Sequence, residues 1–247
     1  MITNLAYFFE AAKEIRGGRA VWVKDSNGES RNNILLGGTI LNPNKSFGHL
    51  WAAQLMEYHP GEGIKIFRSF KVQANAASNA TTIYLNGDGF SDAPEVGQYL
   101  MVAPDDVVVE TLTVSEGVVT KSVADYTGTY AKVTDVEYDA ENKKFKVTLA
   151  NALGAALTTD TILVEADAAA DAALAEPTGS AKVLCPKPNI FNEVDRDLMP
   201  TEGFGIRNAN YSVSGIYNKQ AWIERMQPLP KYVLKYNKSL IDGIFHI

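Results

Sequence analysis

The chain has 247 residues, enough for two modest domains or for one domain with substantial arms. Hydrophobic residues make up 46% and charged residues 21%, the balance of an ordinary globular protein rather than a disordered or fibrous one. No apolar run approaches the ~20 residues of a membrane-spanning helix. The single cysteine, Cys185, excludes an internal disulfide framework and a cysteine-based zinc site.

The formal net charge of −6 conceals an uneven distribution. Residues 1–71 hold nine basic and six acidic side chains, residues 72–181 hold five and seventeen, and residues 182–247 again hold nine and six. An acidic centre of −12 therefore lies between two flanks of +3 each. Because acidic surfaces repel phosphates and anionic lipids, we expect the centre to face solvent and expect neither membrane binding nor direct nucleic-acid binding.

The first predicted element is a short helix over residues 4–16, which Thr3 or Asn4 can cap and Gly17 can end. Its larger apolar side chains share one broad face: Leu5, Phe8, Phe9 and Ile15. A helix this short is marginal alone, so the face is expected to dock on the protein's own core or on a neighbouring subunit.

Three strands are predicted in the rest of the N-terminal flank, over residues 20–24, 33–41 and 64–72. Residues 48–58 fit either a short helix or a strand, and residues 58–61 are expected to form the lip of a turn.

From residue 73 the pattern becomes a series of short β segments separated by turn residues: 81–85, 98–102, 107–114, 118–123, 130–136, 144–149 and 161–165. The clearest hairpin joins 130–136 to 144–149, in whose second strand Phe145, Val147 and Leu149 should point inward. The expected fold is mainly β, with a small antiparallel barrel or sandwich (73–181) inserted between β-rich flanks (1–72 and 182–247).

The C-terminal flank follows an alanine-rich exit over residues 166–181. Prolines predict an extended segment at 185–189, and strands are expected through 206–235, broken at Gly215 and at residues 228–230. Residues 240–247 form an apolar tail that is costly in water unless it packs against something. The two flanks are expected to fold together into one attachment domain.

A row of alternating carboxylates is the strongest candidate for a metal site: Asp135, Glu137, Asp139 and Glu141. Calcium needs such oxygens, but also backbone carbonyls and a tight loop around the ion. A solvated strand running into a hairpin turn explains the row better, since charges on strand edges also block unwanted pairing.

No set of residues meets the minimum for a nucleophile, a base and an oxyanion site, so we expect no enzyme, no cofactor and no metal. His49 and His59 lack the third ligand of a catalytic zinc, and Cys185 is expected to be a buried, inert thiol.

Five central segments resemble the small β modules of virion proteins from tailed bacteriophages: 80–85, 96–102, 130–136, 146–149 and 161–166. The flanks look similar to auxiliary capsid proteins of crAss-like phages. The resemblance implies an auxiliary capsid or head-decoration protein, made in the host cytoplasm and present in many copies on the capsid surface. Its implied partners are the major capsid protein and other virion proteins.

On this hypothesis the basic, aromatic-rich flanks attach to the capsid and the acidic centre faces outward. The candidate intersubunit contacts are apolar or aromatic residues of the flanks: Leu5, Phe8, Phe9, Ile15, Trp222, Tyr232, Leu240, Ile244 and Phe245.

Two alternatives stay open. A head-fibre or adhesion module would bind a host glycan or receptor through exposed aromatic rings such as Tyr84, Tyr99 or Tyr126. A glycan-active enzyme would need two carboxylates about 5–10 Å apart in a cleft.

Overall fold

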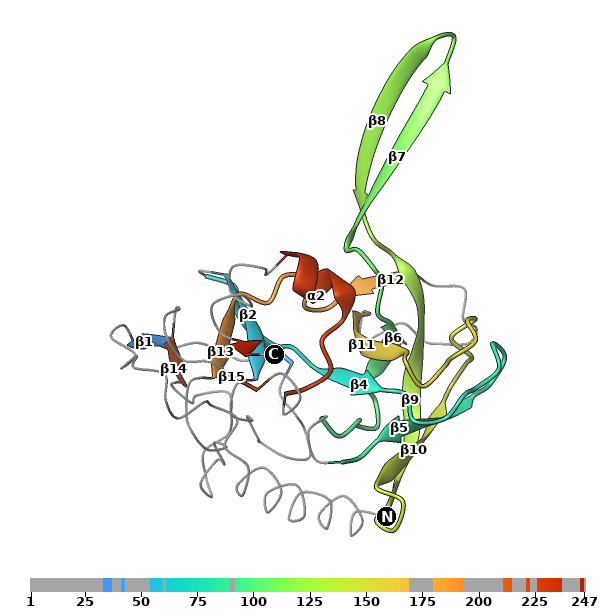
Figure 1. Ribbon diagram of the computed structural model, residues 1–247, viewed down its shortest axis with the longest axis vertical. Helices are drawn as coiled ribbons and strands as arrows, with labels where there is room; N and C mark the ends of the chain where they lie inside the picture. The colour runs from blue at the N-terminus through green and yellow to red at the C-terminus, as the bar shows by residue number, and fades with distance from the viewer. Residues whose placement is uncertain are drawn as a thin grey trace.

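In the computed structural model, a mainly β fold with antiparallel sheets surrounds two apolar cores, which confirms the predicted fold class (Figure 1). The residues that the structure describes are 33–36, 41–42, 54–59, 61–88, 92–168, 180–192, 211–214, 221–222, 226–236 and 245–246. The predicted helix at 4–16 and strand at 20–24 lie outside the described residues.

One sheet of five strands joins the two flanks of the chain. In spatial order it contains β1 (Asn33–Leu36), β14 (Tyr211–Ser214), β13 (Ile190–Asn192), β2 (Leu55–His59) and β3 (Gly63–Ile66). All four pairings are antiparallel. A tight turn links β2 to β3, where the Glu62 amide donates to the His59 carbonyl at 3.0 Å, as the pattern at 58–61 predicts.

A second sheet of seven strands forms most of the centre. Its strands are β4 (Ser69–Lys71), β5 (Thr82–Asn86), β6 (Tyr99–Val102), β9 (Gly128–Asp139), β10 (Lys144–Leu149), β11 (Ile162–Asp167) and β12 (Ser180–Val183). The pairings run β11–β6–β9–β10–β5, and β4 pairs with β11. A bridge from Val72 to Leu85 then connects the end of β4 back to β5, so six strands close into a small barrel.

The barrel interior is filled by alternating side chains, as predicted for β10, where Phe145, Val147 and Leu149 are all buried. Strand β9 changes its inward register halfway along, from Val133 to Val136. The cause is a β-bulge: Thr148 pairs with Asp135 whereas Leu149 pairs with Val133, so one residue of β9 is left unpaired. The bulge keeps both halves of this long strand packed against the core.

A second core lies on the outer side of the barrel. Strands β6 and β11, and β9 near its start, are buried on both faces, because Leu100, Ala131 and Leu163 face the barrel interior while their neighbours face the second core. This second core takes residues from all three sequence segments: Leu55, Phe67, Met101, Tyr130, Val164, Val183 and Tyr232 are among them. The predicted domain boundaries stay a prediction.

The strand predicted over residues 64–72 is wrong in one respect, since it divides into β3 and β4, which belong to different sheets. The chain turns at Phe67, whose amide donates to the Leu55 carbonyl at 3.0 Å. The Phe67 carbonyl accepts a hydrogen bond from the Gln227 side chain at 3.0 Å. The next residue, Arg68, is buried within a network of polar side chains.

The strand predicted through residue 235 is also wrong, because Lys231–Tyr236 forms the helix α2. Pro230 fixes a backbone angle compatible with a first helical turn and lacks the amide that such a turn leaves unpaired. Its carbonyl accepts from the Val233 amide at 3.0 Å. Elsewhere in the flank, β15 (Ala221–Trp222) and β16 (Phe245–His246) pair in parallel.

Replacing a barrel side chain should test the core directly. Phe145→Ala removes a fully buried ring and should lower the free energy of unfolding by about 3–5 kcal/mol. Lys146→Ala, the next residue on the outer face, loses only a half-exposed ion pair with Glu137 and should cost less than about 1 kcal/mol. Urea unfolding measures both, and equal losses would contradict the inward register of β10.

Candidate functional site

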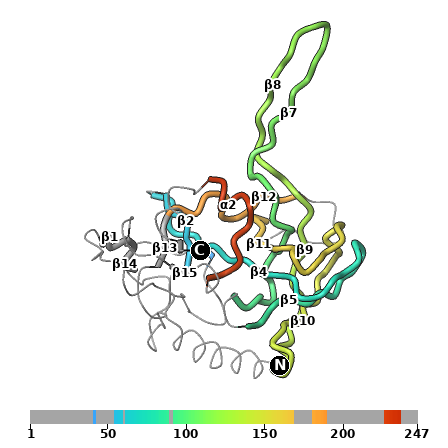
Figure 2. Tube along the Cα trace, viewed as in Figure 1, coloured from blue at the N-terminus to red at the C-terminus, as the bar shows by residue number. Residues whose placement is uncertain are grey.

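A long hairpin extends away from the two sheets and is the most exposed structure among the described residues (Figures 1 and 2). It consists of β7 (Val108–Ser115) and β8 (Val118–Asp125), paired in register along their whole length. Glu116 and Gly117 form the turn with φ of 50° and 79°, the two positive values that a tight hairpin turn of this hand requires. We call this hairpin the arm.

The arm has two unlike faces, because residues opposite each other in the register share a side. One side carries four large aliphatic side chains that are 60–70% exposed: Leu112, Val114, Val119 and Val123. We call these four residues the apolar face. Glu110 and Lys121 lie on the same side and form an ion pair of 2.8 Å.

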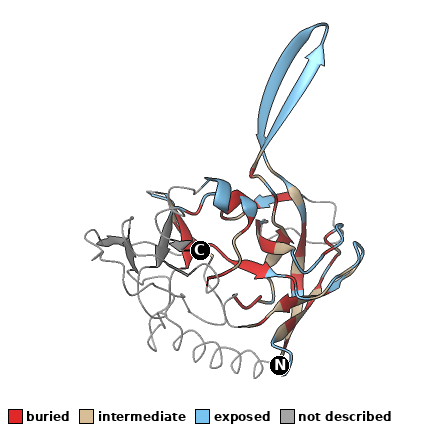
Figure 3. Cartoon of the chain, in the orientation of Figure 1, coloured by how far each residue is buried: buried red, intermediate tan, exposed pale blue. Residues whose placement is uncertain are grey.

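The opposite side of the arm is mostly hydroxyl-bearing. Thr111 pairs with Ser122 and Thr113 pairs with Thr120, and the Ser122 hydroxyl donates to the Thr111 carbonyl at 3.4 Å. Val109 and Val118 also lie on this side, so the two sides differ in degree. The arm is exposed along its length, and the described residues form no layer over its apolar side (Figure 3). A two-stranded ribbon is marginally stable in water unless something covers its apolar side.

Helix α2 holds the base of the arm through a cluster of charged side chains. Lys231 bridges Asp105 at 2.9 Å, and both Lys235 and the Tyr236 hydroxyl donate to Asp106. Asp106 also accepts the Val108 amide at 3.1 Å, at the first residue of β7. Hydrogen bonds from Lys235 and Tyr236 lower the pKa of Asp106 from its ordinary 3.8 to about 2.

A cavity of about 270 Å³ lies at the base of the arm, lined by residues of β2, the arm and β12. Its buried carboxylate, Glu57, accepts from the Lys187 amide at 2.7 Å and lies 2.8 Å from His59 Nε2. On the other wall Asp125 pairs with Lys182 at 2.8 Å. Both carboxylates of this cavity are engaged by partners from the chain itself.

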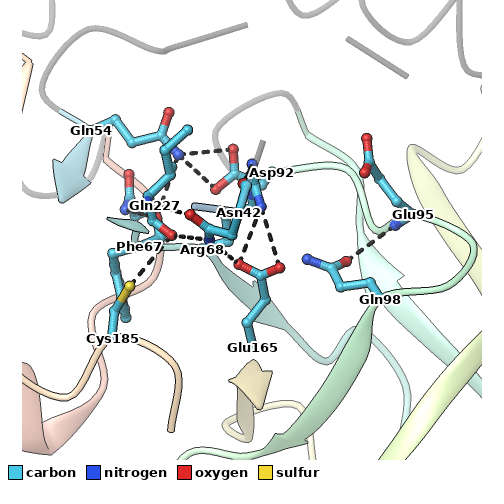
Figure 4. Close-up of polar contacts among 11 residues, drawn as sticks. Asn42, Gln54, Phe67, Arg68, Asp92, Glu95, Gln98, Glu165, Cys185 and Gln227 are labelled. Carbon is cyan, nitrogen blue, oxygen red and sulfur yellow. Dashed lines mark hydrogen bonds and ion pairs between the residues drawn. The ribbon is translucent and has the colours of Figure 1, made fainter. Parts of the chain in front are cut away.

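A buried polar network lies where the chain passes between the two sheets (Figure 4). The Arg68 guanidinium lies 3.2 Å from both Glu165 oxygens and donates to the Asn42 carbonyl at 2.8 Å, while the Asn42 amide donates to Glu165 at 2.8 Å. Burial is the largest single influence and would lower the pKa of Arg68, but Glu165, Asp92 and Glu95 together outweigh it, so the pKa is raised. The network fastens the loop before β4 to β11.

The residues predicted as intersubunit contacts are only partly described. Trp222 and Phe245 lie in β15 and β16, where their backbones pair with neighbouring strands. The prediction that Tyr232 contacts another subunit is wrong, because this side chain is fully buried in the second core. Its ring packs edge to face with the Phe67 ring, with the two centroids 6.5 Å apart. The other predicted contacts lie outside the described residues: Leu5, Phe8, Phe9, Ile15, Leu240 and Ile244.

The tyrosines of the adhesion hypothesis are half-buried instead of exposed. Tyr84 lies under the Lys144 ammonium at 4.9 Å, and Tyr99 packs edge-on against Tyr130 at 5.7 Å. Tyr126 packs against the second core. Each of the three rings is therefore engaged in part by contacts within the chain.

The carboxylates predicted to lie on a solvated strand do lie on the outer face of β9 and in the turn after it. Glu137 pairs with Lys146 at 3.0 Å, and Asp139 accepts the Asn142 amide at 3.0 Å inside the hairpin turn. Across the part of the chain that the structure describes, no three histidine, cysteine or acidic residues are grouped to hold a metal ion. Cys185 is buried, as predicted, and burial raises the pKa of its thiol well above the ordinary value.

The arm's apolar face is a candidate binding surface that the sequence prediction missed. Both strands were expected, but not their separation from the rest of the sheet. The available clue is that Leu112 and Val114 alternate with threonines, as Val119 and Val123 do with Thr120 and Ser122. Such alternation indicates one apolar side without showing what covers it.

Comparison with known proteins finds no match to this chain among family models, curated proteins or solved structures. No helix in the described ranges is long and apolar enough to cross a membrane. The resemblance to phage virion proteins therefore rests on the sequence pattern alone.

Breaking the buried ion pair should destabilise the fold. Arg68→Met leaves Glu165, only 11% exposed, without its charged partner and should cost about 3–5 kcal/mol of unfolding free energy. Lys121→Met breaks an exposed pair on the arm and should cost less than about 1 kcal/mol. Similar losses in urea unfolding would contradict a fastening role for the network.

Acid should weaken the attachment of α2 to the arm. The folded-state pKa of Asp106 lies below its ordinary value, so its carboxylate stabilises the fold above about pH 4, and this contribution is lost as the pH falls through about 2. Asp106→Asn should therefore be less stable than the parent at neutral pH, and the difference should disappear near pH 2. Urea unfolding midpoints measured from pH 7 to pH 2 test this, and a difference independent of pH would contradict it.

Proposed function

We propose that the chain is a virion structural protein, an auxiliary capsid or head-decoration protein that binds the major capsid protein lattice and stabilises it. The arm's apolar face is the single observation that supports a binding role most strongly. Four aliphatic side chains stand 60–70% exposed on a ribbon with no covering layer. Contiguous exposed apolar surface of this kind marks sites of protein association.

The rest of the fold suits an attachment role. Helix α2 contacts the base of the arm, and β8 is followed closely by β9, which supplies side chains to both cores. The free end of the arm can therefore be presented at a fixed place to a neighbouring subunit. Each contact would bury apolar surface, which stabilises the assembly by about 25 cal/mol per Å². Repeated over many copies, these contacts would strengthen the shell.

The acidic centre explains why the contact would be confined to the arm. Residues 72–181 carry −12, which opposes non-specific association with other acidic surfaces. On the apolar side of the arm Glu110 pairs with Lys121, and Asp125 at the base pairs with Lys182. Binding there avoids burying an unpaired charge.

Polar substitutions on the arm should reduce binding to capsids assembled without this chain. Leu112→Ser together with Val114→Ser removes two exposed apolar side chains, and the resulting loss of about 2–3 kcal/mol corresponds to at least a tenfold lower affinity. Thr111→Ser with Thr113→Ser, on the opposite side of the same strand, is the matched control. Co-sedimentation with the capsids measures all three proteins.

The proposal fails if the unsubstituted chain does not co-sediment with such capsids. It loses its structural basis if the serine variant of the apolar face binds as well as the threonine control. Circular dichroism and urea unfolding of both variants would show that the body of the fold is unchanged.

A further inference from the structure

We infer that the partner of the arm's apolar face is the same face on a second copy of this chain, so that neighbouring copies are linked by arms stacked face to face. This inference rests on the proposed function for its setting, a shell of many copies, where contacts between arms would add to the binding of each chain to the capsid, so that the serine variant of the apolar face would bind capsids more weakly. Its contact is nevertheless a property of the chain alone and can be measured without capsids.

The chemistry of the face favours another sheet as its partner over a pocket. Pockets in other proteins take up aromatic or arginine side chains, which supply most of the energy at such contacts. The apolar face contains only leucine and valine, on a regular twisted ribbon. Two sheets pack well when their twists match, and a second arm has the same twist.

Charge also favours a second copy at this one place. Two chains of net charge −6, each with a centre of −12, repel one another over most of their surfaces. On the apolar side of the arm, Asp125 at the base is already paired with Lys182, while Glu110 and Lys121 sum to zero. Under a twofold axis each of these residues can also meet the opposite charge of the partner copy, so the surface is self-complementary.

The area of the contact sets its strength. A ribbon eight residues long and two strands wide has a face of roughly 27 by 10 Å, on the order of 300 Å². A stable interface buries about 800 Å² on each partner. The contact between arms is therefore weak in dilute solution and becomes effective where copies are held close together.

Site-directed cross-linking of the full chain tests the inference. Leu112→Cys and Val119→Cys place a thiol on the apolar face, and Thr113→Cys and Thr120→Cys place one on the opposite side at the same height of the arm. The native Cys185 is buried and gives the background. At about 1 mM protein, chosen because the contact is weak, a short bismaleimide should link the first two variants at least fivefold faster than the other two.

Equal rates for the two pairs, or no cross-linked dimer from either, would overturn the inference. The outcome is separable from that of the proposed function. Loss of capsid binding in the serine variant without cross-linking between copies would mean that the face binds the capsid protein instead. Cross-linking between copies without any capsid binding would keep the homotypic contact and remove the capsid role.

Discussion

Burial of the inner face of β9 in the barrel, together with Tyr130 in the second core, is the constraint on which the rest of the molecule depends. This strand has twelve residues, pairs with β6, β10 and β12, and supplies side chains to both cores. A slip of one residue would turn the inward side chains of β9 toward solvent, so burial of its inner face fixes the register of the strand. The arm is a direct continuation of it, because β8 ends three residues before β9 begins.

An exposed hairpin needs this kind of support. Alone, a two-stranded ribbon loses about as much in chain entropy as its pairing returns. Here the lower end is anchored by β9 on one strand and by the cluster of Asp106, Lys235 and Tyr236 on the other. The fold thus concentrates its stability at the base and leaves the apolar face free for another molecule.

Much of the fold follows from local patterns in the sequence. The alternation through Phe145, Val147 and Leu149 gives the inward side of β10, and Glu116-Gly117 gives the turn of the arm, because both depend on neighbouring residues only. The division at Phe67 could not be predicted, since it depends on Leu55 and Gln227, which are distant in sequence. The helix α2 was missed for a related reason: Tyr232 and Val233 are buried by tertiary contacts, and their aromatic, β-branched character suits a strand equally well.

The candidate site was less predictable than the fold, because exposure is a property of the whole molecule. Leu112 and Val114 have the same local pattern as residues in the barrel wall, and only the position of their strands decides which are covered. Cryo-microscopy of capsids carrying the bound chain tests the central claim most directly. The account predicts protein density over Leu112, Val114, Val119 and Val123 at every occupied site. An arm that points into solvent with its apolar face uncovered would contradict it.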